Sequence, residues 1–169
     1  VLTADIDLAG YDWTPIGNSF NYGFAGSFDG QNHKVYNMAV NYSATTTSSP
    51  YQGFFGCVSG KPAARASISN LTVEGIAEIT STGKVSYAYS GGVVGWGTYV
   101  DMTGVRADVD VKITRVNGNW QYVGGLAGNL VNSTVTNCSN AGKISAWSYS
   151  AGLVGSLSDS TVSGCINTG

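Results

Sequence analysis

Apolar and polar residues alternate without a break along residues 105–113. Successive side chains of a β-strand point to opposite faces, so this period of two predicts a half-buried strand. Its polar positions, Asp108, Asp110 and Lys112, are expected to face outward. Residues 71–79 alternate in a similar way one repeat earlier. The pattern therefore predicts two strands that each bury one face.

The rest of the chain favours short strands and turns over helices. Residues 138–146 and the positions from Cys165 onward correspond to the alternating segments, and we interpret them as later strands. No segment has a convincing helical period. The longest candidate, residues 61–66, is short and has Pro62 at its start, so we interpret it as a loop insertion. The prediction is an all-β chain.

One motif recurs along the chain: an aromatic residue, any residue, a small residue, glycine, two apolar residues and glycine. Three clear copies occupy residues 89–95, 122–128 and 149–155, and degenerate copies lie at 53–56 and 23–26. A second landmark, asparagine or glycine, follows at Asn37, Asn70, Gly104, Asn137 and Gly164. These landmarks are 33, 34, 33 and 27 residues apart. A period of this length predicts a stacked repeat architecture.

A repeat of about 30 residues made of short strands suits a parallel β-helix, or solenoid, of about five coils. Each coil would lay its strands on those of the next coil, so that equivalent residues form columns. One inward column is expected at Leu71, Val105, Cys138 and Cys165. The landmark asparagines and glycines are expected at bends with left-handed backbone. The alternative is a β-propeller or an antiparallel sandwich, although propeller blades need about 40 residues each.

Two groups of segments resemble a known family. Residues 124–128, Gly-Gly-Leu-Ala-Gly, followed by Val-Thr-Asn-Cys at 135–138, resemble the GLUG repeat of bacterial surface proteins. The segments that resemble the region preceding such repeats are residues 2–8, 13–17 and 24–35. The resemblance covers nearly the whole chain, and its motifs are specific for architecture and unspecific for activity.

This resemblance implies a right-handed parallel β-helix in an exported, often cell-wall-attached protein. Residues 1–42 are expected to form a leading repeat and residues 43–169 GLUG-like repeats. The family includes adhesin-like proteins, accessory regions of surface glycosidases and non-catalytic repeats of IgA-specific metallopeptidases. Its members carry further repeats or domains on both sides, so we expect the chain to be a segment of a longer protein.

The composition sets aside two classes of protein. The net charge is −2, charged residues make up 11% of the chain, and the eight Lys and Arg residues form no cluster. Because nucleic-acid binding needs a basic patch, no nucleic-acid partner is expected. No apolar run approaches the ~20 residues of a membrane span. The hydrophobic fraction of 43% is ample for a folded core.

We expect no catalytic site in this chain. The peptidases of the family that it resembles use a His-Glu-x-x-His zinc motif, which is absent here. His33 is expected to hydrogen-bond loop backbone and order a turn, in preference to serving a Ser-His-Asp triad. A polysaccharide-degrading β-helix would use clustered acidic groups, and the candidates here are Glu74, stacked over Asp108, and Glu78, near Lys112. Their outward positions favour the interpretation that they keep this face soluble.

Two further groups have a structural and a functional interpretation. Asp5, Asp7 and Asp12 offer the hard oxygens that Ca²⁺ prefers, but the same pattern follows from strand alternation, and no metal or cofactor is predicted.

Cys138 and Cys165 occupy matching positions one repeat apart, within reach of a disulfide. The odd total of three cysteines and the apolar residues elsewhere in this column favour reduced, buried thiols.

Aromatic pairs recur at the same place in three successive repeats, as Tyr87 and Tyr89, Trp120 and Tyr122, and Trp147 and Tyr149. Residues i and i+2 of a strand share a face, so the pairs predict a two-column ladder of six rings. Facing outward, the ladder would offer an apolar strip for sugar rings. Its hydrogen-bonding neighbours would be Asn119, Gln121, Ser148 and Ser150. Facing inward, the rings would fill the solenoid or its corners, and the sequence leaves both interpretations open.

The sequence thus predicts a non-catalytic extracellular module that serves as a rigid stalk or adhesive surface, with host or cell-wall glycan as a ligand of the ladder. The alternative is an accessory module of a large surface hydrolase, a glycosidase or an IgA-specific metallopeptidase, whose catalytic domain lies outside this chain. Flanking domains of the parent protein are expected partners. Open solenoid ends also expose strand edges, which predicts end-to-end association of copies.

Overall fold

The computed structural model describes residues 1–44, 50–81, 86–114 and 120–169. These residues form twenty β-strands and one 3₁₀ turn, η1 (Phe20–Tyr22). No α-helix occurs among them, and accordingly no helix long and apolar enough to cross a membrane. The prediction of an all-β chain is confirmed for this part of the protein.

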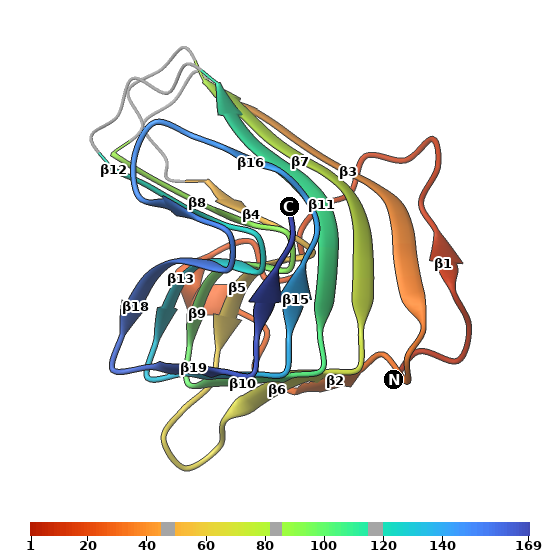
Figure 1. Cartoon of the computed structure of the whole chain (residues 1–169), viewed down its shortest axis with the longest axis vertical. Helices are drawn as coiled ribbons and strands as arrows, with labels where there is room; N and C mark the ends of the chain where they lie inside the picture. The colour runs from red at the N-terminus through yellow and green to blue at the C-terminus, as the bar shows by residue number, and fades with distance from the viewer. Residues whose placement is uncertain (45–49, 82–85, 115–119) are drawn as a thin grey trace.

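The strands form four parallel sheets, which we name A to D (Figure 1). Sheet A contains β1 (Ile6–Asp7), β3 (Lys34–Ala44), β7 (Thr72–Ser81), β11 (Arg106–Thr114), β15 (Ser139–Asn140), β16 (Ile144–Ser145) and β20 (Ile166–Asn167). Sheet B contains β5 (Phe55–Ser59), β9 (Val94–Thr98), β13 (Ala127–Val131) and β18 (Val154–Ser158). Sheet C contains β2 (Ser27–Asp29), β6 (Ala66–Ser69), β10 (Val100–Thr103), β14 (Thr134–Thr136) and β19 (Thr161–Ser163). Sheet D contains β4 (Tyr51–Gln52), β8 (Tyr87–Gly91), β12 (Trp120–Gly124) and β17 (Ser150–Ala151).

From β3 onward the chain visits the sheets in one fixed order, A, D, B and C, before it returns to sheet A. From β6 onward each strand pairs in parallel with a strand one round earlier, and Figure 1 shows β3, β7 and β11 side by side. Arg106 of β11 lies opposite Thr72 of β7, which is 34 residues earlier (106 minus 72). The sequence period is therefore the length of one round, and the arrangement is consistent with a β-helix.

Strand β11 shows how the alternating pattern builds the core. Its inward side chains are Ala107, Val109, Val111 and Ile113, all at most 2% exposed. Its outward side chains include Asp108, Asp110 and Lys112, as predicted. Burying one such valine or isoleucine stabilises a fold by roughly 1.5–3 kcal/mol. The same columns of apolar residues continue through β7 and β3, so one core runs through the rounds.

The corners between sheets C and A have left-handed backbone at four of the five predicted landmarks, with φ angles of 49° at Asn70, 63° at Gly104, 53° at Asn137 and 61° at Gly164. Asn37 also has a left-handed φ of 57°, but it lies inside β3 where the register with β7 shifts, so the prediction of a corner there is wrong. Glycine and asparagine tolerate this conformation better than other residues. The predicted inward column follows each corner: Leu71, Val105 and Cys138 are at most 2% exposed, and Cys165 is partly buried.

Glycines of the recurring motif make room for two amide side chains from sheet A, of which the first is buried. A Cβ on Gly125 would overlap the Asn140 side chain, and one on Gly152 would overlap Asn167. Asn140 is 1% exposed, and its Nδ2 donates to the Gly142 carbonyl and to Asn167 Oδ1, both at 2.8 Å. Its Oδ1 accepts from the Gly142 N–H at 3.2 Å. Every buried polar atom of this amide is therefore satisfied.

The same amide corrects one prediction. Residues 138–146 were expected to form one strand, but only β15 and β16 pair with β11, and the residues between them turn around the Asn140 side chain. The interpretation of residues 61–66 as an insertion agrees with the structure. Lys61 and Ala64 exchange two backbone hydrogen bonds of 3.0 Å in a tight loop before β6, drawn in yellow in Figure 1.

Five aromatic side chains fill the interior at the N-terminal end of the stack: Trp13, Phe24, Phe28, Phe54 and Phe55. Trp13 stacks on Phe54 with ring centroids 5.0 Å apart, and its Nε1 donates to the Phe54 carbonyl at 3.0 Å. Phe55 is fully buried and contacts the rings of Phe24, Phe28 and Phe54. This end of the core is therefore closed by large rings instead of aliphatic residues.

Candidate functional site

The predicted aromatic ladder lies on the outer face of sheet D. In both β8 and β12 the second residue, Ala88 or Gln121, is at most 4% exposed, whereas the residues on either side of it are exposed or half-buried. Alternate side chains of a strand point to opposite faces, so the rings point away from the core. The inward interpretation of the ladder is therefore wrong.

Four tyrosines form the continuous part of this ladder, which we call the tyrosine stack: Tyr51, Tyr89, Tyr122 and Tyr149. Adjacent ring centroids are 5.3, 5.2 and 5.2 Å apart, with interplanar angles of 7°, 8° and 14°. The strand register places Tyr51 opposite Tyr89 and Tyr89 opposite Tyr122. Sequence reasoning missed Tyr51, although it lies two residues before Gly53 as Tyr89 lies two before Gly91.

The second predicted column does not form. Tyr87 packs against Tyr89 of its own strand with centroids 6.1 Å apart, and Trp120 packs on Tyr149 at 5.4 Å. Trp147 has no ring partner in the described part of the chain and is 87% exposed. Tyr149 has a left-handed φ of 31°, and β17 begins only after it, so Trp147 lies outside the sheet. The six-ring ladder is corrected to a four-tyrosine stack with flanking rings.

Stacking covers the ring faces in the middle of the tyrosine stack. Tyr89 and Tyr122 each have a near-parallel ring on both sides, so they present mainly their edges to solvent. Burial raises the pKa of Tyr89 to about 12 and also raises the pKa of Tyr51 and Tyr122. Their hydroxyls therefore stay protonated well above neutral pH.

The most exposed rings gather at the C-terminal end of the ladder. Trp120 is 42% exposed, Tyr149 50% and Trp147 87%. Of the predicted hydrogen-bonding neighbours, Ser148 and Ser150 lie beside them in sequence. Gln121 points inward, and its Oε1 accepts from the backbone N–H of Trp147 at 3.3 Å. The fourth predicted neighbour, Asn119, lies outside the described residues.

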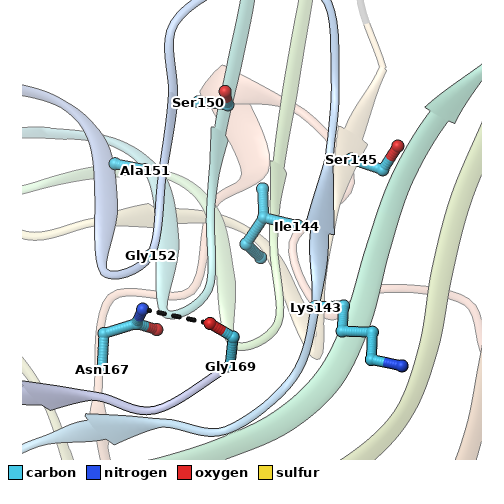
Figure 2. Close-up of a pocket in the computed structure, with 8 residues that line it drawn as sticks. All are labelled: Lys143, Ile144, Ser145, Ser150, Ala151, Gly152, Asn167 and Gly169. Atoms are coloured by element: carbon cyan, nitrogen blue, oxygen red, sulfur yellow. Dashed lines mark hydrogen bonds between the residues drawn. The ribbon is translucent and has the colours of Figure 1, made fainter.

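A pocket of about 550 Å³ lies between β16 and β17 at the same end. Figure 2 shows Ile144 pointing from β16 toward Ala151 and Gly152, while Lys143 and Ser145 point to the other side. The pocket's lining also includes Ser150, Asn167 and Gly169. Asn167 Nδ2 donates to the Gly169 carbonyl at 3.5 Å, the dashed line in Figure 2. The pocket thus exposes interior positions of the last round together with a few polar groups.

The predicted carboxylate neighbours are adjacent, but each is paired with a cation. Glu74 lies opposite Asp108 in the register of β7 and β11. Glu74 Oε2 is 3.5 Å from the Nζ of Lys34, and Asp108 Oδ2 is 3.3 Å from the guanidinium of Arg106. Glu78 and Lys112 form the expected pair at 3.1 Å. These contacts agree with the interpretation of the residues as charges on a solvent-facing sheet.

The three N-terminal aspartates do not converge. Asp5 Oδ1 contacts His33 Nδ1 at 3.0 Å and accepts the Lys34 N–H. Asp7 accepts from Asn37 Nδ2 at 2.8 Å, and Asp12 accepts from an asparagine further along β3. Among the residues that the structure describes, no three His, Cys, Asp or Glu side chains gather as a metal site would require. The calcium hypothesis therefore has no geometric support.

His33 is a structural residue with a partner different from the one predicted. Loop backbone was expected, whereas the imidazole contacts the Asp5 carboxylate and so ties the first segment of the chain to the start of β3. The Lys34 N–H and His33 together lower the pKa of Asp5, the backbone hydrogen bond being the stronger cause. In the described residues no serine hydroxyl hydrogen-bonds to His33, so the geometry offers no Ser-His-Asp arrangement.

The cysteines are free thiols with a defined hydrogen-bonding role. Cys138 Sγ accepts from the Val105 N–H at 3.4 Å, and Cys165 Sγ accepts from the Cys138 N–H at 3.3 Å. Burial raises the pKa of Cys138 to about 11 and that of Cys57 to about 12. The prediction of reduced, buried thiols is confirmed for Cys138, whereas Cys165 is a free thiol that is only partly buried. The thiols of Cys138 and Cys165 also link successive rounds.

Comparison with known proteins adds one match to this geometry. Neither the curated proteins nor the solved structures that were searched gave a match. A protein-family model described as "The GLUG motif" matches residues 121–145. The matched stretch runs from β12 of sheet D through one round of the stack to β16. The resemblance drawn from the recurring glycine motif is confirmed there, because residues 121–145 match the model of this motif.

Proposed function

We propose that this chain is a non-catalytic module of a secreted or cell-wall-attached bacterial protein. In this proposal it folds as a right-handed parallel β-helix of about five coils, and it serves as a rigid stalk or adhesive surface. Support comes from the fixed order in which the chain visits sheets A, D, B and C. The GLUG motif at residues 121–145 is consistent with a non-catalytic repeat module.

The observation that carries the stalk proposal is the continuity of side-chain contacts along the stack. Apolar columns in the core, the tyrosine stack outside sheet D and the thiols at the sheet C to A corner each connect successive rounds. A column that is unbroken from round to round resists bending, because bending would open contacts on one side. The module therefore suits a function in which shape is held over a distance.

Native-state hydrogen exchange tests the stalk proposal. A rigid stack is expected to protect the amides of β7, β8, β9 and β10 alike, since these strands have neighbours on both sides. The spectrophotometric titration of the tyrosines provides a second readout, in which Tyr89 ionises near pH 12. Rapid exchange throughout one of these sheets, or tyrosines that all titrate together at their ordinary value, would contradict the proposal.

Glycan binding at the exposed end of the ladder is the second candidate function. It rests on the exposure of Trp120, Trp147 and Tyr149, which together offer more free ring surface than the middle of the tyrosine stack. Sugar rings stack on indole and phenol faces, and the Tyr149 hydroxyl and Ser150 are available as polar contacts. The candidate binding surface is therefore the C-terminal end of the ladder and not its whole length.

A glycan array read out by tryptophan fluorescence tests this second candidate. Trp147→Ala is expected to abolish binding of any glycan that the protein retains, because this ring is the most accessible one. The matched control is Tyr11→Ala, which removes an aromatic ring that is 74% exposed near the other end of the chain. Equal binding by both variants, or no glycan retained at all, would rule this candidate out.

A further inference from the structure

A groove lies along the corner between sheets B and C, on a surface that contains none of the ladder residues. One wall consists of Tyr99, Asn132 and Asp159, one residue from each of three successive rounds. All three have left-handed backbone, with φ angles of 50°, 51° and 48°. The backbone N–H of Tyr99 donates to the Val131 carbonyl at 3.0 Å, and that of Asn132 donates to the Ser158 carbonyl at 2.9 Å. These hydrogen bonds join successive rounds. The wall is therefore built by the same geometry in each round.

The opposite wall follows sheet C. Thr134 and Thr161 line it and lie opposite each other in the parallel register of β14 and β19, and Asp101 precedes them in the same column on β10. Neighbouring strands are about 4.8 Å apart, so this wall presents one polar side chain per step of that length. Arg65 closes one end of the groove, where its guanidinium forms two 2.8 Å hydrogen bonds to the Asp101 carboxylate.

The floor of the groove is fixed by a ladder of serine hydroxyls. Ser133 is 3% exposed, and its Oγ accepts from the Val100 N–H at 3.0 Å and donates to the Val131 carbonyl at 2.8 Å. Ser160 repeats the arrangement one round later, accepting from the Ser133 N–H at 2.9 Å. The floor therefore has satisfied polar groups and a fixed shape, as a preformed binding surface requires.

The walls, in contrast, hold polar side chains without partners. The side chains of Asn132, Thr134, Asp159 and Thr161 make no hydrogen bond within the described part of the chain. They line a cavity of about 280 Å³, together with Arg65, Tyr99 and Ser133. This volume lies near the lower end of the range of small-ligand pockets, roughly 300–1,000 Å³. A ligand of one or two small rings would fit such a groove.

The lining chemistry favours one class of ligand. The charges of Arg65 and Asp101 offset each other, so Asp159 leaves the groove negatively charged and unsuited to phosphates or other anions. None of the lining residues is aliphatic, which disfavours a purely apolar ligand. What remains free is an amide, a carboxylate and two hydroxyls beside the Tyr99 ring, and the Arg65 guanidinium lies over this ring 5.9 Å from its centroid. These groups donate to and accept from hydroxyls, and the ring offers an apolar surface next to them.

We propose that this corner groove binds an uncharged saccharide, with Asn132 and Asp159 as its hydrogen-bonding residues and Tyr99 as its ring contact. The site is separate from the exposed end of the aromatic ladder. The groove is formed by the sheet B to C corners of successive rounds, so binding there does not depend on whether the ladder binds glycan.

The test is an NMR titration of the whole chain with methyl glycosides of neutral hexoses and N-acetylhexosamines. Binding in the groove is expected to shift the backbone amide resonances of Asn132, Ser133 and Asp159 in a saturable manner. Asn132→Gly and Asp159→Gly keep the left-handed backbone, because glycine adopts it without strain. Each is expected to weaken binding about tenfold, as loss of a hydrogen-bonding side chain does.

The matched control is Asn137→Gly, which removes an exposed asparagine with a φ of 53° from the sheet C to A corner. It should bind the same glycoside as the unmodified chain does. The proposal is overturned if no glycoside shifts the groove resonances, or if all three glycine variants bind equally. Shifts confined to Trp147 and Tyr149 that disappear in Trp147→Ala would also overturn it, while they would support binding at the ladder.

Discussion

The two ends of the stack complete their cores in different ways. At the N-terminal end, five aromatic rings pack together and bury Phe55 completely. At the other end, Leu157, which lies opposite the fully buried Leu130, is 45% exposed, and the pocket of Figure 2 opens between β16 and β17. The rounds at the two ends differ in length and in the residues that they contribute to each shared column. We therefore expect local stability to follow the residues of each column.

One column of sheet B makes the contrast explicit. Phe55, Val94, Ala127 and Val154 lie opposite one another in successive rounds. The side chain shrinks from phenylalanine to alanine along this column, and Val154 at its end is 8% exposed, whereas the other three are fully buried. Matched substitutions within one column therefore measure how firmly each end is packed.

The largest effect is expected for Phe55→Ala. This change removes a ring that contacts Phe24, Phe28 and Phe54, and a buried Phe→Ala change costs about 3–5 kcal/mol of unfolding free energy. Val154→Ala in the same column should cost about 1–2 kcal/mol, because fewer buried groups are lost and solvent already reaches the site. Urea denaturation of both variants measures the difference. Equal losses would show that the aromatic cluster does not anchor its end.

The second prediction compares the two rungs of the amide ladder. Asn140→Ala leaves the N–H and carbonyl of Gly142 without their side-chain partner, which should cost about 1–3 kcal/mol. The alanine itself fits, because Ala107 occupies the same column one round earlier. Asn167→Ala removes the exposed rung and should cost about 1 kcal/mol or less. Thermal unfolding of the two variants measures the loss of stability. A larger loss for Asn167→Ala than for Asn140→Ala would contradict the prediction that the buried amide contributes more.

A third, smaller effect is expected in acid and only at the N-terminal end. Hydrogen bonds lower the pKa of Asp5, Asp7 and Asp29 below the ordinary value of 3.8, the leading donors being the Lys34 N–H, the Asn37 side chain and the Gln31 N–H. The unfolded chain therefore takes up these protons first as the pH falls. The stability that they confer is present above pH 3.8 and is lost as the pH falls through and below that value.

Hydrogen exchange at decreasing pH locates this acid effect. Amides of β1 and β2 should lose protection before those of β18 and β19, since the three aspartates lie on the first round. Replacing the three aspartates with asparagine is the control and should flatten the pH dependence at this end. An unchanged acid response in that variant would assign the effect to other groups.

The smallest effect concerns solvent access without loss of stability. Trp147 is 87% exposed, whereas Trp13 stacks on Phe54 and donates its N–H to a backbone carbonyl. Acrylamide should therefore quench Trp147 strongly and Trp13 weakly. Trp147→Phe is expected to lower the quenching constant of the remaining emission, and Trp13→Phe to raise it. The reverse order would place the C-terminal tryptophan inside the stack.

Much of this architecture is readable in the sequence because it depends on local rules repeated at a fixed interval. Strand alternation located β11, and the left-handed preference of asparagine and glycine located the corners at Asn70, Gly104 and Asn137. Both signals arise within a few residues, so neither needs knowledge of distant contacts.

Features made by unlike residues from different rounds were harder to predict. The aromatic cluster joins Trp13 and Phe24, which belong to irregular segments, to Phe54 and Phe55 of the next round. Trp147 matched the ladder spacing, but the backbone at Tyr149 turns away from the sheet.

The corner groove had a spacing signal that residue type concealed. Tyr99, Asn132 and Asp159 are 33 and 27 residues apart (132 minus 99 and 159 minus 132), as are the landmarks Gly104, Asn137 and Gly164. Tyr99 at the first of the three positions hid this second set of bends, because tyrosine rarely adopts left-handed backbone, whereas glycine, asparagine and aspartate do so more readily.

The parallel pairing of every round with the next also determines how the chain would respond to tension. A pull on the terminal round loads its pairs in sheets A to D, and once these separate the next round carries the load. Each round of about 33 residues then releases roughly 110 Å of extended chain. Such a stack lengthens in discrete steps, dissipating work at each one, which suits a tether that must withstand shear.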